Sequence, residues 1–349
     1  MNNYIDYTVI QKYMQELLSI PSPTGNTSKA TKYITDILTE LKVNYTITNK
    51  GAVIAVLEGE DKTIERSFSA HIDTLGAMVK SINENGTLSI VPIGGYMMSS
   101  IDGENCIIET MDEKNYTGTF QNIKPSVHIH GNDARELKKI PENMEVVLDE
   151  KVKNKSAVEA LGISVGDFIF PDTRTTFTSS GFIKSRYLDD KASASILLYA
   201  IKYLKENNIK LPYNTSFFFS NYEEVGHGAS SSHSKNIKEF ISVDMGAPGK
   251  GQNSSEYSVC ICAKDSSGPY DLELRKKLTA LCREKNIDYR IDIYPYYGSD
   301  ASAALAAGWD FKAALIGPGV FASHAYERTH QDAVVATAEL IIAYSMEGM

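Results

Sequence analysis

The stretch FFFSNYEEVG, at residues 217–226, decides the fold, because an apolar run of strand-forming residues ends in two adjacent carboxylates. The phenylalanines predict a buried strand of the kind found in the parallel sheets of α/β proteins. Neighbouring residues of an extended strand point to opposite faces, so Glu223 and Glu224 can serve two different directions at one site. Other parts of the chain must supply the groups that these two acids face.

Strands and helices alternate through most of the chain. Helical spacing of apolar residues predicts helices at residues 7–18, from the expected N-cap Thr27 to about residue 41, and at 191–205, 270–285, 301–307 and from about 332. Strands are predicted at VNYTITN, GAVIAVLEG, ERSFSAHID, TSFFFSN, FISVDMG, SVCICAK, YRIDIYPY and FKAALIG. This alternation predicts an α/β fold of three αβα layers with a mostly parallel central sheet.

Residues 76–172 have a different pattern, in which short β runs alternate with turn residues. The runs are TLSIVPIGG, NCIIETM, YTGTFQNI, SVHIHG and MEVVLDE. They predict a small β-rich, barrel-like domain inserted into the α/β domain. We therefore expect a discontinuous α/β domain at residues 1–75 and 173–349, interrupted by an insertion at 76–172.

Composition restricts the classes of partner. Of the 349 residues, 42% are hydrophobic and 23% charged, which is typical of a globular protein, and the formal charge is −9. Nucleic acid is not an expected partner, because phosphate recognition needs concentrated Lys and Arg. The start MNNYIDYTVIQKYMQELLSI lacks a basic segment followed by an apolar run, and no stretch approaches the roughly 20 apolar residues of a membrane span. We expect a cytoplasmic protein that does not bind membranes.

The cysteines are few and scattered, at Cys106, Cys260, Cys262 and Cys282. None of them form a C-x-x-C pair. Cys260 and Cys262 are separated by one residue and therefore share one face of an expected strand. We expect buried free thiols rather than a metal or redox site.

Metal-binding residue types recur at the ends of the expected elements. They are His71 and Asp73 in SAHIDTLG, Asp189 and Asp190 in RYLDDKAS, Glu223 and Glu224 in NYEEVG, Asp244 in SVDMG, and His324 in ASHAYERTH. Each of these residues, taken alone, has a structural explanation that involves no metal. Asp189 or Asp190, for example, could be the N-cap of the following helix. Open α/β sheets, however, build their sites at the carboxyl ends of strands. Together, imidazole and several carboxylates are the ligands that zinc, cobalt or manganese would bind.

In this order, the motifs HID, LDDK, YEEVG, VDMG and SHAYE resemble the M42 glutamyl aminopeptidase family, within the clan of co-catalytic metallopeptidases. The resemblance covers nearly the whole chain. Within the insertion, TGTFQNIKPSVHIH and EVVLDEKVKNKSAVEALGISVGDFIFPD follow the order of the family's dimerisation domain, and GSDASAALAAG resembles its GTDA segment. The resemblance implies a metal-dependent aminopeptidase that removes N-terminal residues from short peptides.

The resemblance also implies two divalent metal ions per subunit, Zn²⁺ or Co²⁺, with Mn²⁺ as a further candidate. Asp189 is implied to bridge them. His71 and Asp244 would complete one metal site, and Glu224 and His324 the other.

The resemblance assigns catalytic roles to two further acids. Glu223 is implied to be the general base that takes a proton from the attacking water and passes it to the leaving amine. Asp73 is implied to accept the other ring N–H of His71 and so to fix its tautomer. Asp190 is implied to be structural, joined to Asp189 by an unusual peptide geometry.

This chain departs from the family pattern at three places. Lys191 stands where arginine is common, and only His227 separates EEVG from Gly228. The usual late motif His-Ser-Pro-x-Glu is replaced by HAYERTH, so His330 competes with His324 for the last metal position.

The remaining candidates carry less weight. His227, Arg328 and the tyrosines of YPYYGSD are possible pocket residues, and His233, in SSSHSKN, is expected in solvent. His128 and His130 are expected at the surface or in turns of the insertion, although an inserted domain can lend a group to a neighbouring active site.

Other functions remain open at this point. The same metal set serves carboxypeptidases and N-acyl deacylases, and members of the family have been labelled endoglucanases, which need two carboxylates but no metal. A noncatalytic metal-binding scaffold is the alternative from another class. The resemblance further implies a homo-oligomer, with dimers formed through the insertion and a hollow dodecamer as a further expectation.

Overall fold

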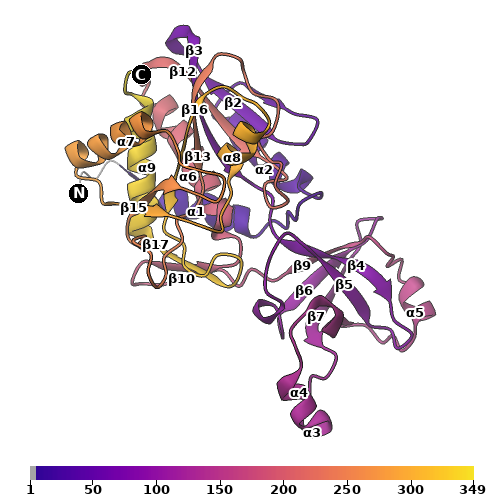
Figure 1. Cartoon of the computed structure of the whole chain (residues 1–349). Helices are drawn as coiled ribbons and strands as arrows, with labels where there is room; N and C mark the ends of the chain where they lie inside the picture. The colour runs from indigo at the N-terminus through magenta and orange to yellow at the C-terminus, as the bar shows by residue number, and fades with distance from the viewer. Residues whose placement is uncertain (1–4) are drawn as a thin grey trace. The chain divides into compact units, whose positions relative to one another are not determined.

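An eight-stranded sheet organises the larger of two units in the computed structural model, which describes residues 5–349. The α/β unit comprises Met1–Thr74 and Arg174–Met349, and the barrel unit comprises Leu75–Thr173. The strand order of the large sheet is β1-β2-β12-β3-β13-β16-β14-β15 (Figure 1). Its strands are β1 Tyr45–Ile47, β2 Val53–Leu57, β3 Gly59–His71, β12 Leu211–Ser220, β13 Ile237–Val243, β14 Val259–Lys264, β15 Tyr289–Ile293 and β16 Lys312–Pro318.

The centre of this sheet is parallel. Strand β3 pairs in parallel with both β12 and β13, and β13 pairs in parallel with β16. The contacts of β2 with β12 and of β14 with β16 are antiparallel. The carboxyl ends of β3, β12, β13 and β16 therefore meet at one edge, where open α/β sheets place their sites.

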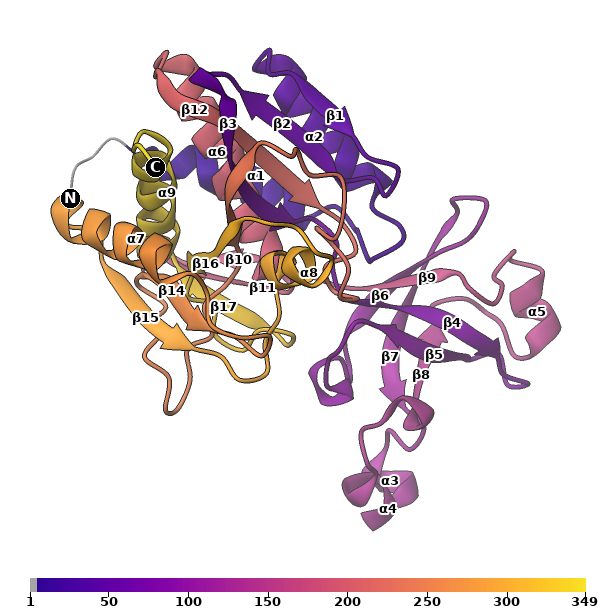
Figure 2. The same cartoon turned by 45° about the horizontal axis from the view of Figure 1, so that its top comes forward.

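Helices cover both faces of the sheet (Figures 1 and 2). The α/β unit contains α1 Tyr7–Leu18, α2 Ser28–Glu40, α6 Leu188–Glu206, α7 Leu272–Lys285, α8 Asp300–Ala306 and α9 Gln331–Ser345. Helix α6 packs on β3 and against α1 and α9, and α8 contacts β13 and β16. A smaller sheet of β10 Thr176–Phe177, β11 Phe182–Ser185 and β17 Glu327–His330 completes the unit. The predicted α/β fold class is confirmed.

The phenylalanine run explains why β12 lies inside the sheet. Phe217, Phe218 and Phe219 are all buried, so both faces of the strand are covered. Phe217 stacks on Phe68 of β3, with ring centroids 5.8 Å apart. Phe218 joins a buried cluster with Ala301 of α8 and residues of other strands.

The barrel unit is a closed barrel with the strand order β4-β5-β8-β7-β6-β9. Its elements are β4 Gly76–Ile82, β5 Leu88–Ile93, η1 Met98–Ser100, β6 Asn105–Glu109, β7 Asn115–Asn122, α3 Val127–His130, α4 Asn132–Glu136, η2 Pro141–Asn143, β8 Met144–Leu148, α5 Lys155–Glu159 and β9 Phe168–Pro171. All the barrel pairings are antiparallel. A buried apolar cluster that includes Ile108, Phe120 and Val146 fills the unit.

One predicted strand of this unit is wrong. The run SVHIHG forms the short helix α3, in which the amide of His130 donates to the carbonyl of Ser126. None of the α3 residues is buried. Alternating β-branched residues form a strand only where a neighbouring strand and a core are available. In this segment the backbone amides bond to carbonyls of the same helical turn instead of to a neighbouring strand.

Two smaller expectations are also corrected. Helix α2 begins after Thr27 as predicted, but the Thr27 hydroxyl makes no capping bond and instead accepts a hydrogen bond from Asn221 Nδ2 at 2.5 Å. His233 is buried rather than in solvent, packed edge-on against Trp309 and Phe240. Burial lowers the pKa of His233, and its Nε2 lies 2.5 Å from the carbonyl of Ala229.

The four cysteines are free and buried. Across residues 5–349, no helix has the length and apolar character needed to cross a membrane.

Candidate metal centre

Three buried side chains meet where the parallel strands end. His71 is the last residue of β3, Asp244 follows β13, and Asp189 lies in the first turn of α6. Each offers one ligand atom, and these atoms lie within 4.8 Å of one another. An imidazole and two carboxylates so close together form a group that could hold a divalent metal ion.

Asp189 faces two histidines with its two carboxylate oxygens. Its Oδ1 lies 3.2 Å from Nε2 of His71, and its Oδ2 lies 3.5 Å from Nε2 of His324. The hydroxyl of Ser323 also donates to Oδ2, at 2.7 Å. Burial alone would raise the pKa of Asp189, but the hydrogen bond with His71 and the nearby His324 hold it at about 2. Asp189 is therefore the point at which two groups of possible metal-binding side chains meet.

The second group adds Glu224, whose Oε2 lies 3.5 Å from Nε2 of His324. Its other oxygen, Oε1, is buried and has no hydrogen-bond partner among residues 5–349. Burial, and then the charge of Asp189, raises the pKa of Glu224 well above its usual range. A buried carboxylate oxygen without a donor is costly unless a cation neutralises it, so these residues fit a metal ion.

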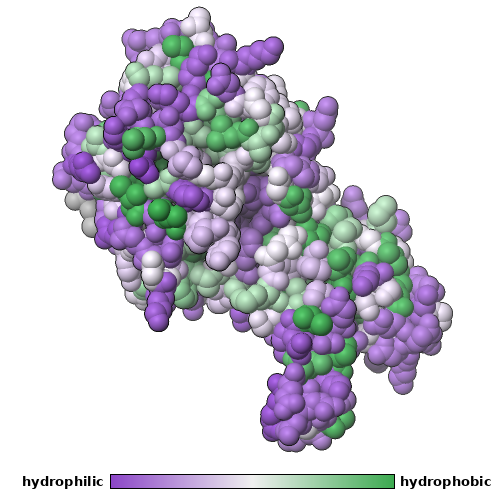
Figure 3. All heavy atoms as spheres, in the orientation of Figure 1, coloured by the Kyte–Doolittle hydropathy of each residue, from purple (hydrophilic) through white to green (hydrophobic). Residues whose placement is uncertain are grey.

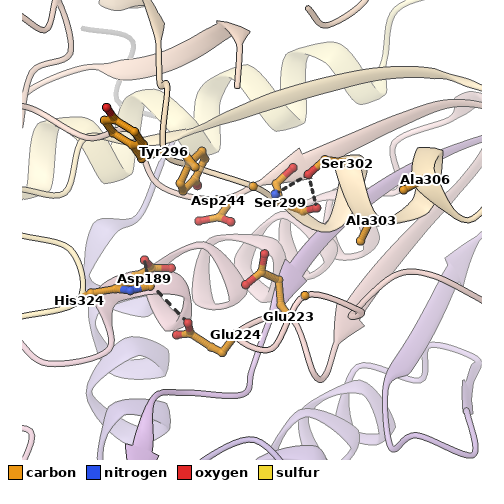
Figure 4. Close-up of a pocket in the computed structure, with 13 residues that line it drawn as sticks. Asp189, Glu223, Glu224, Asp244, Tyr296, Ser299, Ser302, Ala303, Ala306 and His324 are labelled. Carbon is orange, nitrogen blue, oxygen red and sulfur yellow. Dashed lines mark hydrogen bonds and ion pairs between the residues drawn. The ribbon is translucent and has the colours of Figure 1, made fainter. Parts of the chain in front are cut away.

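Glu223 enters the same space from the loop after β12 (Figure 4). Its Oε2 lies 3.7 Å from Nε2 of His71. Burial raises the pKa of Glu223 well above its usual range, and the charge of Asp244 adds to that effect. The pKa of Asp244 itself is raised to about 7, by burial and then by the charge of Asp189. In Figure 4 the carboxylates of Glu223, Glu224, Asp189 and Asp244 surround one central space.

Asp73 lies at the site, but its contacts differ from the expected ones. Nδ1 of His71 is 2.9 Å from the backbone carbonyl oxygen of Asp73 and 3.7 Å from its carboxylate. The carboxylate instead accepts the backbone amides of Glu223 and Glu224, at 3.2 and 3.3 Å, and the hydroxyl of Thr24 at 2.6 Å. Asp73 thus orients His71 through its main chain and holds the loop of the two glutamates through its side chain.

Asp190 follows Asp189 through a cis peptide bond. Its Oδ2 accepts the backbone amide of His71 at 3.1 Å. Lys191 is fully buried, and its ammonium donates to the carbonyls of Leu17 and Ile20.

Two buried acids that support the site were missed by the sequence analysis. The carboxylate of Glu327 accepts the backbone amides of Asp189 and His324, both at 3.1 Å. Asp300 accepts the hydroxyls of Ser69 and Ser220 and the amide of Ala229. Glu327 lies in the motif SHAYE and Asp300 in GSDA. A sequence does not indicate which acids accept hydrogen bonds from backbone amides and hydroxyls.

His324, not His330, lies beside Asp189 and Glu224. The ring of His330 is bound elsewhere: Nε2 is 2.9 Å from the carbonyl of Ser180, and Nδ1 accepts the amide of Asp332.

Of the remaining candidates, Tyr296 and Tyr297 of YPYYGSD line a cavity beside the cluster, as expected of pocket residues, whereas His227 and Arg328 have other partners. His227 stacks on Tyr222, and Arg328 lies over the ring of Phe182 and pairs with Glu256. His128 and His130 belong to the barrel unit, where His128 is exposed.

A cavity of about 420 Å³ opens beside the cluster. Its lining comprises Asp189, Glu223, Glu224, Gly226, Asp244, Tyr296, Tyr297, Gly298, Ser299, Ser302, Ala303, Ala306 and His324. The acids and His324 form one part of this lining, and helix α8 with the segment before it forms another (Figure 4).

Gly317 of β16 fixes the position of Asp244. A Cβ at Gly317 would lie 1.5 Å from the backbone oxygen of Asp244. We expect Gly317→Ala to displace Asp244, to weaken metal binding and to destabilise the fold by about 1–3 kcal/mol or more. Denaturant unfolding and metal titration measure the two effects. Gly249→Ala is the control, because its Cβ would meet no atom within 4 Å. Parental stability and parental metal binding in Gly317→Ala would contradict the prediction.

Comparisons with known proteins identify relatives of the chain. Residues 51–340 match the model of the M42 glutamyl aminopeptidase family. The chain is 50% identical over 345 residues to a Bacillus subtilis (strain 168) protein named "Putative aminopeptidase YhfE", covering 98% of this chain and 99% of that one.

Solved structures share the fold. A TET aminopeptidase from a marine sediment archaeon of the Thaumarchaeota superposes with a TM-score of 0.88 at 17% identity, covering 97% of each chain. The TET1 peptidase of Pyrococcus horikoshii, which can assemble into a tetrahedron or a large octahedral shell, superposes with a TM-score of 0.82 at 22% identity, covering 97% of this chain and 100% of that one.

Proposed function

The chain belongs to the M42 glutamyl aminopeptidase family, which makes it an aminopeptidase hydrolase, and we propose that it removes N-terminal residues from short peptides at a two-metal centre. One observation carries this proposal: the two oxygens of Asp189 face two different histidines, His71 and His324. A carboxylate so placed can bridge two cations.

The ligands divide into two sets around Asp189. His71 and Asp244 complete one set, and Glu224 and His324 the other. Zn²⁺, Co²⁺ and Mn²⁺ all suit a site of imidazole and carboxylate. When bound, such ions polarise the scissile carbonyl and lower the pKa of water.

Glu223 is the proposed general base. It lines the cavity and is not needed in either ligand set. A carboxylate that no metal engages can take a proton from the attacking water and return it to the leaving amine. Asp73 positions Glu223 by accepting its backbone amide.

An assay with blocked and unblocked substrates tests the proposal. Purified protein, loaded with zinc, cobalt or manganese after chelation, is offered aminoacyl anilides, N-acetylated aminoacyl anilides and N-blocked peptides with a free carboxyl end. We expect hydrolysis of the unblocked anilides alone, and none before metal is restored. Cleavage of the N-acetylated substrates would indicate a deacylase, and release of C-terminal residues a carboxypeptidase. If the metal-loaded protein hydrolysed none of these substrates, the noncatalytic metal-binding scaffold would be the remaining function.

We further propose that the chain forms homo-oligomers through the barrel unit, residues 75–173. Several large apolar side chains are exposed on this unit, including Met97, Met111, Ile129 and Val165. Hydrophobic residues are visible among the hydrophilic ones on the face of Figure 3. The TET1 peptidase of Pyrococcus horikoshii, which has this fold and can assemble into a tetrahedron or a large octahedral shell, supports the proposal. Light scattering should give a multiple of 38.5 kDa, and a mass of one chain would contradict this proposal.

A further inference from the structure

Apart from four acids and His324, the cavity lining carries no charged side chain. Among the described residues, this uncharged wall comprises Gly226, Tyr296, Tyr297, Gly298, Ser299, Ser302, Ala303 and Ala306. Helix α8 supplies the last three, and Ala303 and Ala306 lie three residues apart on one side of it. The acids of the metal centre lie across the cavity from α8 (Figure 4).

Three hydroxyls of the uncharged wall, those of Ser299, Ser302 and Tyr297, are already bonded within the protein. Ser302 Oγ accepts the amide of Ser299 at 2.7 Å and donates to its carbonyl at 2.8 Å. The hydroxyl of Ser299 shares a hydrogen bond with Tyr270 at 2.9 Å. The hydroxyl of Tyr297 donates to the carbonyl of Met245 at 3.0 Å. The surface left for a ligand is therefore mainly the two alanine methyl groups and the tyrosine rings.

A charged ligand group would find no partner on this wall. A carboxylate against Ala303 and Ala306 would lose water without gaining a cation. An ammonium or guanidinium group would likewise lose water without gaining a carboxylate. The one carboxylate of α8, Asp300, is buried, accepts the hydroxyls of Ser69 and Ser220, and does not line the cavity. An aliphatic group gives up no hydrogen bonds with water when it binds there, and the burial of its apolar surface is favourable.

We propose that the uncharged wall receives the side chain of the substrate's N-terminal residue and selects neutral aliphatic residues, such as leucine and methionine, over acidic and basic ones. This inference rests on the proposed aminopeptidase function, since the scissile bond must lie at the metal centre beside the wall. The glutamyl preference in the family's description does not extend to this chain, because its wall offers no cation.

A panel of aminoacyl anilides tests the selectivity. kcat/KM of the metal-loaded enzyme is measured for leucyl, methionyl, glutamyl and lysyl anilides. We expect the neutral substrates to exceed both charged ones by about tenfold or more. Equal or faster cleavage of the glutamyl or lysyl anilide would overturn the inference and leave the proposed function standing. Failure to cleave any unblocked anilide would overturn both.

Charge substitutions on α8 test the location of the wall. Ala303→Lys should raise the ratio of glutamyl to leucyl cleavage by about tenfold, and Ala303→Glu should raise the ratio of lysyl to leucyl cleavage similarly. Ala306→Lys and Ala306→Glu repeat the test at an exposed position, in case residue 303 does not tolerate a long side chain.

Leu305 provides the matched control. It lies on the same helix and is 41% exposed, but it does not line this cavity. Leu305→Lys and Leu305→Glu should keep the parental order of substrates. Unchanged ratios in the variants at 303 and 306, or equal shifts in the variants at 305, would overturn the assignment of the wall.

Discussion

Glu223→Gln is expected to lower kcat by about 10²- to 10⁴-fold, the usual contribution of general acid–base catalysis, while the protein retains its metal ions. Glutamine has almost the same shape but cannot accept the proton of the attacking water. The backbone amide of residue 223 would still donate to Asp73, so the loop should keep its position. Steady-state kinetics and elemental analysis of the same preparation measure both quantities.

Glu224→Gln provides the contrast to this variant, because the neighbouring residue is assigned to the metals. Its Oε2 lies 3.5 Å from His324 and its Oε1 is buried without a donor, so the substitution should reduce metal content together with activity. If Glu223→Gln lost metal, or kept near-parental kcat, the division of roles between the two glutamates would be wrong.

Asp189→Asn is expected to have the second large effect, which is the loss of metal from both ligand sets. An amide offers one oxygen instead of two and carries no charge, so it cannot bridge two cations. We expect the affinity for metal to fall by more than the 10- to 100-fold that is typical of a residue that only supports a ligand. Activity should fall with it. The melting temperature should also lose its dependence on added metal, because a ligand stabilises a fold only as far as it binds.

Asp271→Asn is the matched control for that variant. Asp271 is the N-cap of α7, where its side chain accepts the amide of Leu274. Asparagine caps helices as well as aspartate does, so metal content, activity and stability should stay parental. A variant Asp189→Asn with two tightly bound ions would contradict the bridging role.

The fold could be predicted from the sequence where burial controls it. The run at Phe217 predicted a strand covered on both faces, and β12 is such a strand. The run SVHIHG shows the limit, since the same residue types formed a helix where no strand was available to pair with them. His233 looked solvent-exposed because its sequence neighbours are polar, but aromatic residues far along the chain enclose it.

The candidate site could be predicted only as far as residue type and element ends allow. The acids and histidines were predicted to converge, because open α/β sheets build their sites at the carboxyl ends of strands. The grouping of His71, Asp189 and Asp244 was implied by the family resemblance. Which atom of Asp73 faces His71 depends on the turn of the chain after β3, and the sequence did not reveal it. Glu327 was missed because its role is to accept two backbone amides. The metal and catalytic roles themselves stay predictions.

Anomalous diffraction from crystals of the zinc-loaded protein tests the central claim most directly. We predict two zinc peaks per chain, one beside His71 and Asp244 and one beside Glu224 and His324, with an oxygen of Asp189 bound to each. A single peak, or a second peak beside His330 rather than His324, would contradict it.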